Sequence, residues 1–510
     1  MVSKIHSMGL WGIDAFPVEI EADLSTGMPS FEVVGLPDAA VRESRDRIRA
    51  AFKNAGFAFP ISRITVNMAP ADQKKEGTLY DLPLFIALLS ASGQLRTPNP
   101  SSVFLGELSL SGEVRPVKGV LPMAIAAQEA GFSSLFVPAA NAAEGAVVEG
   151  LSVYPVRHVA DLYRHLTGEA PLTPAKPSAE DGPPAAPLPD FAEVRGQELA
   201  KRALEIAASG GHNVLLIGSP GTGKSMLAKR LPSILPDMTM AEQIETSKIY
   251  SIAGALPAGA SLVRTRPFRA PHHTVSAAGL SGGGSIPRPG EISLAHNGVL
   301  FLDELPEYER SAMEVLRQPI EDGVVTISRV SGSISYPCSI MLVAAMNPCP
   351  CGYFGHPSRK CTCNPRAVNR YLGRISGPLL DRLDLHVEVP PVSFDRLSSN
   401  ERAEPSSQIK KRVNAARERQ RERLAGTGIP CNAGITPGLL TDLCRPTEAA
   451  RKLLKEAFAQ MELSARAYDR VLKVARTIAD LAGSADLLPQ HAAEAVQYRS
   501  LDRKYWLREL

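Results

Sequence analysis

The sequence predicts an α/β protein of more than one domain, in which a parallel sheet is followed by a helical region. Short β-rich runs at 213–218, 298–302 and 340–345 alternate with segments of helical periodicity, which is typical of a parallel sheet with crossover helices. From about residue 408 onward the pattern is mostly helical. At 510 residues the chain is also too long for one hydrophobic core, so two or three domains are expected.

One domain boundary is visible in the composition. Residues 168–189 are rich in Pro and Ala and contain almost no large apolar side chain, so we expect a semi-extended linker there. We therefore place an α/β domain at 1–167, a second α/β domain at 190–395 and a helical lid domain at 396–510. In the first domain the apolar pattern predicts strands at 31–34 and 64–67, and helices at 38–51 and 82–92.

The bulk composition is that of an ordinary soluble protein, with 44% hydrophobic and 21% charged residues. Because the net charge is only +3, any nucleic-acid surface must be a local patch. Residues 1–13 contain no long apolar core, and no apolar stretch is long enough to span a bilayer. We therefore expect a cytoplasmic protein without a membrane partner.

Residues 218–225 (GSPGTGKS) follow the β-rich run at 213–218 and fit the phosphate-binding pattern GxxxxGK[ST]. Glycines at these positions let backbone N–H groups curl around a phosphate. Lys224 would reach the β- and γ-phosphates, and the Ser225 hydroxyl would hold Mg²⁺. The sequence therefore predicts an ATP and Mg²⁺ site made by Gly218, Ser219, Pro220, Gly221, Thr222, Gly223, Lys224 and Ser225.

Polar residues at the ends of the two following β-rich runs are candidates for the same site. Asp303 and Glu304 end an apolar run, where Asp303 would bind Mg²⁺ and Glu304 would polarise the attacking water. The alternative for this pair is a helix cap at a strand–helix junction. Asn347 follows the third run and would position the water, although an asparagine before Pro348 can also belong to an ordinary turn.

Three arginines could complete the site. Arg382 could reach the γ-phosphate of a neighbouring subunit as an arginine finger, or it could form a structural pair with an aspartate. Arg466 and Arg470 lie four residues apart on one face of a predicted helix. They could approach the nucleotide from above, or they could belong to a solvated helix face.

From residue 190 to its end the chain resembles an AAA+ ATPase of the magnesium-chelatase-like branch. This resemblance implies the following motifs: Walker A at 218–225, Walker B at 299–304, sensor 1 at Asn347, the arginine finger at Arg382, and sensor 2 at Arg466 or Arg470. Residues 194–197 (VRGQ) resemble the adenine-side motif of the same group.

The chain as a whole, apart from the linker, is similar to the ComM/YifB family. The segments that carry this similarity are 35–38 (GLPD), 269–274 (RAPHHT), 347–352 (NPCPCG) and 475–481 (ARTIADL). The resemblance implies a hexameric homo-oligomeric ring that uses ATP to move on single-stranded or branched DNA. It further implies helicase or branch-migration activity in recombination, notably when incoming DNA is integrated in natural transformation.

Two segments resemble family insertions into the ATPase sheet. Residues 268–289 carry Arg269, His272 and His273, and the two histidines could make local hydrogen bonds or contact DNA. Residues 324–337 predict a hairpin around a glycine. Because such hairpins enter the central pore in related rings, Arg329 is a candidate contact for the DNA backbone, unless the hairpin packs only on its own subunit.

The first domain resembles the protease domain of Lon in a degenerate form, on residues 75–79 (KEGTL) and 106–119. Leu79 stands where the resemblance places the serine nucleophile, and Leu121 where it places the catalytic lysine. Without a hydroxyl and an amine there is no dyad to activate. We therefore expect a scaffold that forms the ring or handles DNA, without peptidase activity.

Four of the seven cysteines lie close together as Cys349, Cys351, Cys361 and Cys363. Four thiolates are a soft tetrahedral set that suits a structural Zn²⁺, although the spacing is not the usual C-x₂-C. His356 could replace one ligand, and free buried or redox-active thiols are the alternative.

Residues 410–423 hold seven basic and two acidic side chains on a predicted helix, which could contact phosphates or form a solvated lid face.

The sequence is compatible with three functions. The favoured function is that of a DNA motor. A magnesium-chelatase motor that remodels a protein partner is disfavoured by the Lon-like domain and the cysteines. An unfoldase that feeds a protease is disfavoured by Leu79 and Leu121.

Overall fold

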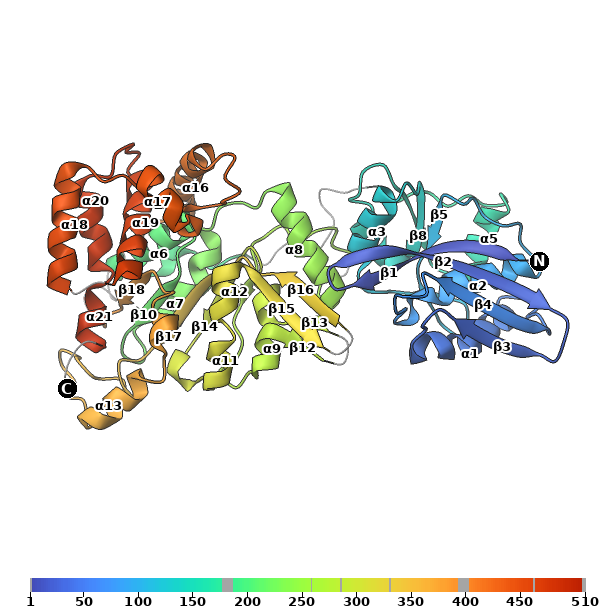
Figure 1. Ribbon diagram of the computed structural model, residues 1–510, viewed down its shortest axis with the longest axis horizontal. Helices are drawn as coiled ribbons and strands as arrows, with labels where there is room; N and C mark the ends of the chain where they lie inside the picture. The colour runs from blue at the N-terminus through green and yellow to red at the C-terminus, as the bar shows by residue number, and fades with distance from the viewer. Residues whose placement is uncertain are drawn as a thin grey trace. The chain divides into compact units, whose positions relative to one another are not determined.

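The computed structural model describes residues 2–176, 187–257, 259–284, 287–329, 332–392, 403–461 and 464–506 (Figure 1). Contacts divide the chain into two compact units. Unit 1 contains residues 1–185, 240–264 and 328–336, and unit 2 contains residues 186–239, 265–327 and 337–510. The division falls inside the expected linker 168–189, of which residues 177–186 lie outside the described part.

Unit 1 is built on a seven-stranded mixed sheet in the order β3-β4-β2-β1-β5-β8-β9. The β1–β2 and β2–β4 pairs are antiparallel, and the other four neighbouring pairs are parallel. The strands are β1 (Ser3–Trp11), β2 (Asp14–Ser25), β3 (Ser30–Val34), β4 (Arg63–Ala69), β5 (Ser102–Phe104), β8 (Ser134–Pro138) and β9 (Ser152–Val156). A separate ribbon joins β6 (Glu107–Leu108) to β7 (Val114–Arg115).

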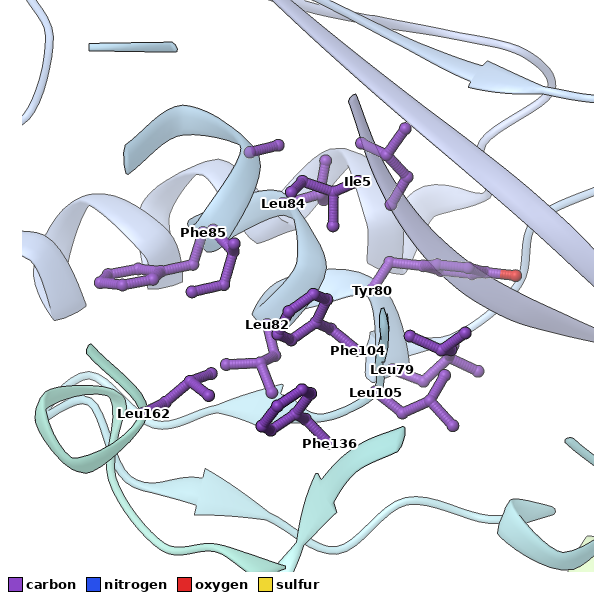
Figure 2. Packing of buried hydrophobic residues seen from close by; sticks show 14 of the residues in the cluster. Ile5, Leu79, Tyr80, Leu82, Leu84, Phe85, Phe104, Leu105, Phe136 and Leu162 are labelled. Carbon is purple, nitrogen blue, oxygen red and sulfur yellow. The ribbon is translucent and has the colours of Figure 1, made fainter. Parts of the chain in front are cut away.

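The core of unit 1 surrounds helix α2 (Asp81–Ala91), all of whose residues are buried. A helix that is apolar on every side must be covered on every side, and α2 contacts both β1 and β2 as well as helix α1 (Ala39–Asn54). Figure 2 shows part of this core, with Phe85, Phe104 and Phe136. The other α-helices between residues 2 and 176 are α3 (Val120–Glu129), α4 (Ala142–Gly145) and α5 (Val159–Leu166).

Leu79 and Leu121, which stand at the expected peptidase positions, are core residues. Leu79 is 7% exposed and belongs to the cluster drawn in Figure 2, and Leu121 is fully buried. Their apolar side chains therefore fill space in unit 1, where neither can supply a nucleophile or a base.

Two segments from the middle of the chain belong to unit 1. Helix α8 (Met240–Ala253) contacts α3, and the backbone N–H of Gly119 donates to the carbonyl of Ser251 at 3.1 Å. Buried Glu144 accepts hydrogen bonds from the Ser251 hydroxyl and, at 2.8 Å, from the backbone N–H of Leu121. Burial raises the pKa of this carboxyl, although these donors oppose the shift.

The second of these segments is the tip of the hairpin predicted at 324–337, which is present as β15 (Val324–Arg329) and β16 (Gly332–Pro337). A Cβ atom on Gly332 would lie 2.9 Å from the ring of Trp11, so the tip packs against the turn between β1 and β2. The Arg329 side chain is outside the described part, and its expected contact with DNA stays a prediction.

Unit 2 contains a five-stranded sheet in the order β11-β14-β17-β10-β18, with every neighbouring pair parallel. The strands are β11 (Phe268–Arg269), β14 (Val299–Leu302), β17 (Met341–Met346), β10 (Val214–Ile217) and β18 (Leu385–Glu388). All residues of β10, β14 and β17 are buried, as expected for parallel strands covered on both faces. The α/β fold class with a parallel sheet is thereby confirmed.

Helices and one short ribbon complete the sheet-bearing part of unit 2. The helices are α6 (Glu198–Gly210), α7 (Lys224–Arg230), α9 (Ala277–Ser281), α10 (Glu291–Leu294), α11 (Arg310–Glu314), α12 (Arg317–Asp322), α13 (Pro365–Leu372) and α14 (Gly377–Leu380). Strands β12 (Gly282–Gly283) and β13 (Arg288–Pro289) pair in an antiparallel ribbon.

The C-terminal part is helical, as the sequence predicts. It contains α16 (Ser406–Arg423), α17 (Pro437–Leu443), α18 (Glu448–Met461), α19 (Ala465–Leu481), α20 (Pro489–Gln497) and α21 (Ser500–Tyr505). Among the described helices of the chain, none combines the length and the hydropathy that crossing a bilayer requires.

Several basic side chains of α16 bind acceptors inside unit 2. Arg412 pairs with Glu205 and Glu404, and Lys410 pairs with Asp237. Arg423 places two nitrogen atoms on the carboxylate of Asp480, at 2.6 and 2.7 Å. These pairs join α16 to its neighbours, so several side chains of the basic run stabilise unit 2 itself.

The Asp480 carboxylate is the centre of this network. It is 1% exposed and also accepts from Arg476 at 3.2 Å and from the amide of Asn432 at 2.8 Å. We expect Asp480→Ala to lower the free energy of unfolding by about 3–5 kcal/mol, because buried guanidinium groups lose their counter-charge. Urea denaturation measures the change. Asp442→Ala, which breaks an exposed pair with Arg445, is the control and should leave the midpoint unchanged.

Candidate nucleotide site

A pocket lies at the carboxyl edge of the parallel sheet in unit 2. Strands β10, β14 and β17 end beside one another there, because parallel strands present their carboxyl ends at one edge. The pocket is lined by Pro220, Gly221, Gly223, Lys224, Ser225, Met226, Asp303, Glu304, Met346 and Asn347. The structure thus brings together most of the predicted phosphate loop, the two acidic residues and the asparagine.

The loop after β10 takes its shape from two glycines. Gly221 has a φ angle of +78° and Gly223 one of +93°, a left-handed region that residues with a Cβ rarely adopt. The chain therefore turns sharply before α7 begins at Lys224. Inside the turn, the Thr222 hydroxyl donates to the carbonyl of Ser219 at 3.0 Å.

Lys224 is buried beneath the loop. Its ammonium group donates to the carbonyls of Gly218 and Ser219, at 2.7 and 3.0 Å, and to Oδ1 of Asn347 at 3.1 Å. Burial lowers the pKa of Lys224, while the charges of Asp303 and Glu304 oppose this shift. An ammonium group held in this way is placed to pair with a phosphate.

Ser225 and Asp303 meet in the pocket. The Ser225 hydroxyl donates to Oδ2 of Asp303 at 2.5 Å. A hydroxyl and a carboxylate are the hard oxygen ligands that Mg²⁺ prefers, and Mg²⁺ usually combines one or two protein oxygens with phosphate oxygens and water. The donor set therefore fits the magnesium ion that the sequence predicts.

Glu304 is half exposed at the mouth of the pocket, with an unusual backbone. Its φ angle is +53°, and its backbone N–H donates to Oδ1 of Asp303 at 3.0 Å. Nδ1 of His273 lies 3.5 Å from Oε2 of Glu304. His272 instead directs its Nδ1 to the Thr274 hydroxyl at 3.0 Å. Of the two histidines, His273 thus contacts the site, a role that the RAPHHT segment alone did not reveal.

The three arginines lie elsewhere, and no arginine is among the described residues that line the pocket. Arg382 is 7% exposed and pairs with Glu321, while its other nitrogens donate to the carbonyls of Arg317 and Pro378. The carboxylate partner of Arg382 is thus a glutamate and not the aspartate of the alternative prediction. Arg466 is exposed at the start of α19.

Arg470 is held at the opposite edge of the sheet. It donates to Asp384 at 2.5 Å, and Asp384 precedes β18, whereas the phosphate loop follows the parallel neighbour β10. Burial opposes the ionisation of Asp384, but the hydrogen bond from His212 and the charge of Arg470 hold its pKa well below the ordinary value. This ion pair therefore attaches α19 to the sheet, away from the nucleotide pocket of its own chain.

The four clustered cysteines converge beside the pocket. Their sulfur atoms all lie within 4.8 Å of one another. Cys349 Sγ is 3.4 Å from Cys351 Sγ and 3.7 Å from Cys361 Sγ. Although desolvation opposes it, backbone N–H groups of Tyr353 and Thr362 help lower the pKa of Cys351 to about 5. This geometry fits a tetrahedral metal with four protein ligands, and it leaves His356 outside the set.

Three family models match the chain. The model for magnesium chelatase, subunit ChlI, matches residues 190–397, which contain the pocket. The model for subunit ChlI of Mg-chelatase matches residues 20–141, and the model for the C-terminal part of ChlI matches residues 403–499. An AAA+ domain of the magnesium-chelatase type therefore accounts for the sheet that carries the site.

Curated relatives match nearly the whole chain. A protein named YifB from Salmonella typhimurium is 44% identical over 501 residues, which are 98% of this chain and 97% of the relative. Competence protein ComM from Haemophilus influenzae is 44% identical over 505 residues, with the same two shares. The magnesium-chelatase 67 kDa subunit of Chlorobaculum parvum is 29% identical over 162 residues, 31% of this chain and 23% of that protein.

The position of Glu304 gives a prediction about hydrolysis. Glu304→Gln should still bind ATP but hydrolyse it about 10²–10⁴-fold more slowly, because an amide cannot accept a proton from the attacking water. A fluorescent ATP analogue measures binding, and release of phosphate measures turnover.

Glu307→Gln is the matched control, because Glu307 lies three residues further along and pairs with Arg374 outside the pocket. Normal turnover in Glu304→Gln would remove Glu304 from the role of base.

Proposed function

Because the chain belongs to the family of YifB and competence protein ComM, we propose that it is an ATP-hydrolysing ring motor that acts on DNA. The observation that carries the ATPase part is the pair of hydrogen bonds from Lys224 to Asn347 and from Ser225 to Asp303. These two bonds join the phosphate loop to the residues that follow β17 and β14. The four bonded residues supply a phosphate-binding cation, two oxygen ligands and a water-positioning amide in one pocket.

The polar residues of the pocket have different roles in the proposed hydrolysis. Lys224 binds the β- and γ-phosphates, and exchanges one of its present acceptors for phosphate oxygen. Ser225 and Asp303 hold Mg²⁺, which neutralises charge on the phosphates when it is bound. Glu304 takes a proton from the attacking water, and Asn347 orients that water. His273 is within reach of the same carboxylate.

The composition of the pocket supports the ring in this proposal. An arginine at the γ-phosphate stabilises the charge of phosphoryl transfer, and none of the described residues that line the pocket is an arginine. We assign this role to Arg382 of a neighbouring subunit, which exchanges Glu321 for the phosphate, and we assign lid contacts to Arg466 or Arg470. The assembly is a homo-oligomer, with six subunits expected from the family resemblance.

The DNA part of the proposal rests on the relatives. One relative at 44% identity over 98% of the chain is named a competence protein. We propose that the motor translocates on single-stranded or branched DNA in the cytoplasm and promotes branch migration of incoming DNA in natural transformation. A structural Zn²⁺ on Cys349, Cys351, Cys361 and Cys363 is part of the proposal.

A second candidate is a magnesium-chelatase-type motor that remodels a protein partner. The family models favour it, because all three are described as parts of the chelatase subunit ChlI. However, the chelatase subunit from Chlorobaculum parvum matches only 31% of the chain, whereas the YifB and ComM relatives match 98%. The DNA motor is therefore the better supported function.

The stimulus of the ATPase distinguishes the two candidates. We expect single-stranded or forked DNA to raise ATP turnover and to promote migration of a labelled four-way junction. Lys224→Ala should abolish both activities, because the phosphates lose their cation. If DNA leaves turnover unchanged and a protein partner raises it, the DNA motor is wrong and the remodelling motor stands.

Mixing experiments test the arginine in the neighbouring subunit. Arg382→Ala should bind ATP as the unchanged chain does but hydrolyse it at least about 10³-fold more slowly. Rings mixed from Arg382→Ala and Lys224→Ala chains should regain part of the activity, because one interface then combines an intact pocket with an intact Arg382. Mixed rings as inactive as either parent would exclude action between subunits.

A further inference from the structure

The segment 347–352 touches the nucleotide pocket at both of its ends. At one end, Asn347 accepts the hydrogen bond from Lys224 at 3.1 Å. At the other end, Gly352 lies against the phosphate loop so closely that a Cβ atom would stand 2.4 Å from Cδ of Pro220. Both Asn347 and Pro220 line the pocket. A shift of this short segment therefore moves two walls of the nucleotide site.

The same segment carries half of the cysteine cluster. Cys349 and Cys351 stand between the two pocket contacts, and their sulfur atoms lie 3.7 and 3.5 Å from Sγ of Cys361. A metal bound by the four thiolates would fix the backbone of both residues. Because one residue separates Cys349 from Asn347, and Cys351 directly precedes Gly352, that constraint reaches the pocket directly.

The surroundings leave the segment little freedom to absorb a displacement. The backbone N–H of Gly352 donates to the carbonyl of Cys349 at 3.0 Å, and that of Phe354 donates to Sγ of Cys349 at 3.3 Å. Close-packed elements with fixed partners transmit strain instead of dissipating it.

We propose that Gly352 is a positioning residue of the nucleotide site, and that binding of Zn²⁺ by the cysteines and binding of nucleotide in the pocket are coupled through residues 347–352. The coupling is reciprocal. If bound Zn²⁺ favours the arrangement of residues 347–352 that binds nucleotide, then bound nucleotide raises the affinity of the cysteines for Zn²⁺ by the same factor. This inference rests on the proposed function only in assigning ATP to the pocket and Zn²⁺ to the cysteines.

Two glycines of the loop make a matched pair of variants. Gly352 and Gly355 have φ angles of +83° and +76°, so alanine strains the backbone similarly at both positions. At Gly355 the new Cβ would meet only the end of the Lys504 side chain, at 3.8 Å, which is ordinary contact. At Gly352 it would displace Pro220. A difference between the variants therefore reports the contact with the phosphate loop and not the strain.

The experiment follows the release of Zn²⁺ from the full-length protein to a chromogenic chelator, with and without a non-hydrolysable ATP analogue. We expect the analogue to slow release about fivefold or more in the unchanged chain and in Gly355→Ala. Gly352→Ala should retain its zinc by elemental analysis, bind the analogue about fivefold or more weakly, and release zinc at a rate that the analogue does not change.

Pro220→Ala removes the other side of the contact without backbone strain and should likewise uncouple zinc release from nucleotide. Zinc release that is independent of nucleotide in the unchanged chain would overturn the coupling, while ATPase activity stimulated by DNA would leave the proposed function standing. Identical behaviour of Gly352→Ala and Gly355→Ala would overturn the role of Gly352. An unchanged chain that binds no ATP would overturn both this inference and the proposed function.

Discussion

The hydrogen bond from Lys224 to Asn347 is the contact on which the account of this protein depends. It joins the phosphate loop after β10 to the end of β17, and the bond from Ser225 to Asp303 joins the same loop to the end of β14. Because the three strands are parallel, their carboxyl ends meet at one edge, where the polar side chains that follow them come within hydrogen-bond distance. The phosphate-binding half of the site is therefore formed within one chain.

The arginines that we propose to complete the site are engaged elsewhere in the same chain. Arg382 is paired with Glu321, and Arg470 is paired with Asp384 at the amino end of β18. The pocket has its lysine, its acidic residues and its asparagine in place, whereas no arginine is found among the described residues that line it. Such a pocket can bind phosphate but lacks the arginine charge that stabilises phosphoryl transfer. In the proposed ring, neighbouring subunits would supply this charge, which would make hydrolysis depend on assembly.

The phosphate loop, Asp303, Glu304 and Asn347 could be located from the sequence because each follows a buried strand directly, so local pattern decides where they lie. The contact between His273 and Glu304 could not, since it joins separate segments without a shared periodicity. The attachment of Arg470 to Asp384 depends on how α19 docks on the sheet, which helical periodicity does not determine. Likewise, the sequence placed 240–264 in the range 190–395, whereas contacts such as that between Ser251 and Glu144 place it in unit 1.

In the proposed ring, nucleotide binding is a property of the single chain and hydrolysis a property of the assembly. Both can be measured across a dilution series, with ATP turnover per chain, the mass of the particles and the nucleotide affinity determined at each concentration. We expect affinity to persist in the dissociated chain while turnover per chain falls together with the fraction assembled. Turnover per chain that stays constant after the protein has dissociated into single chains would contradict this expectation.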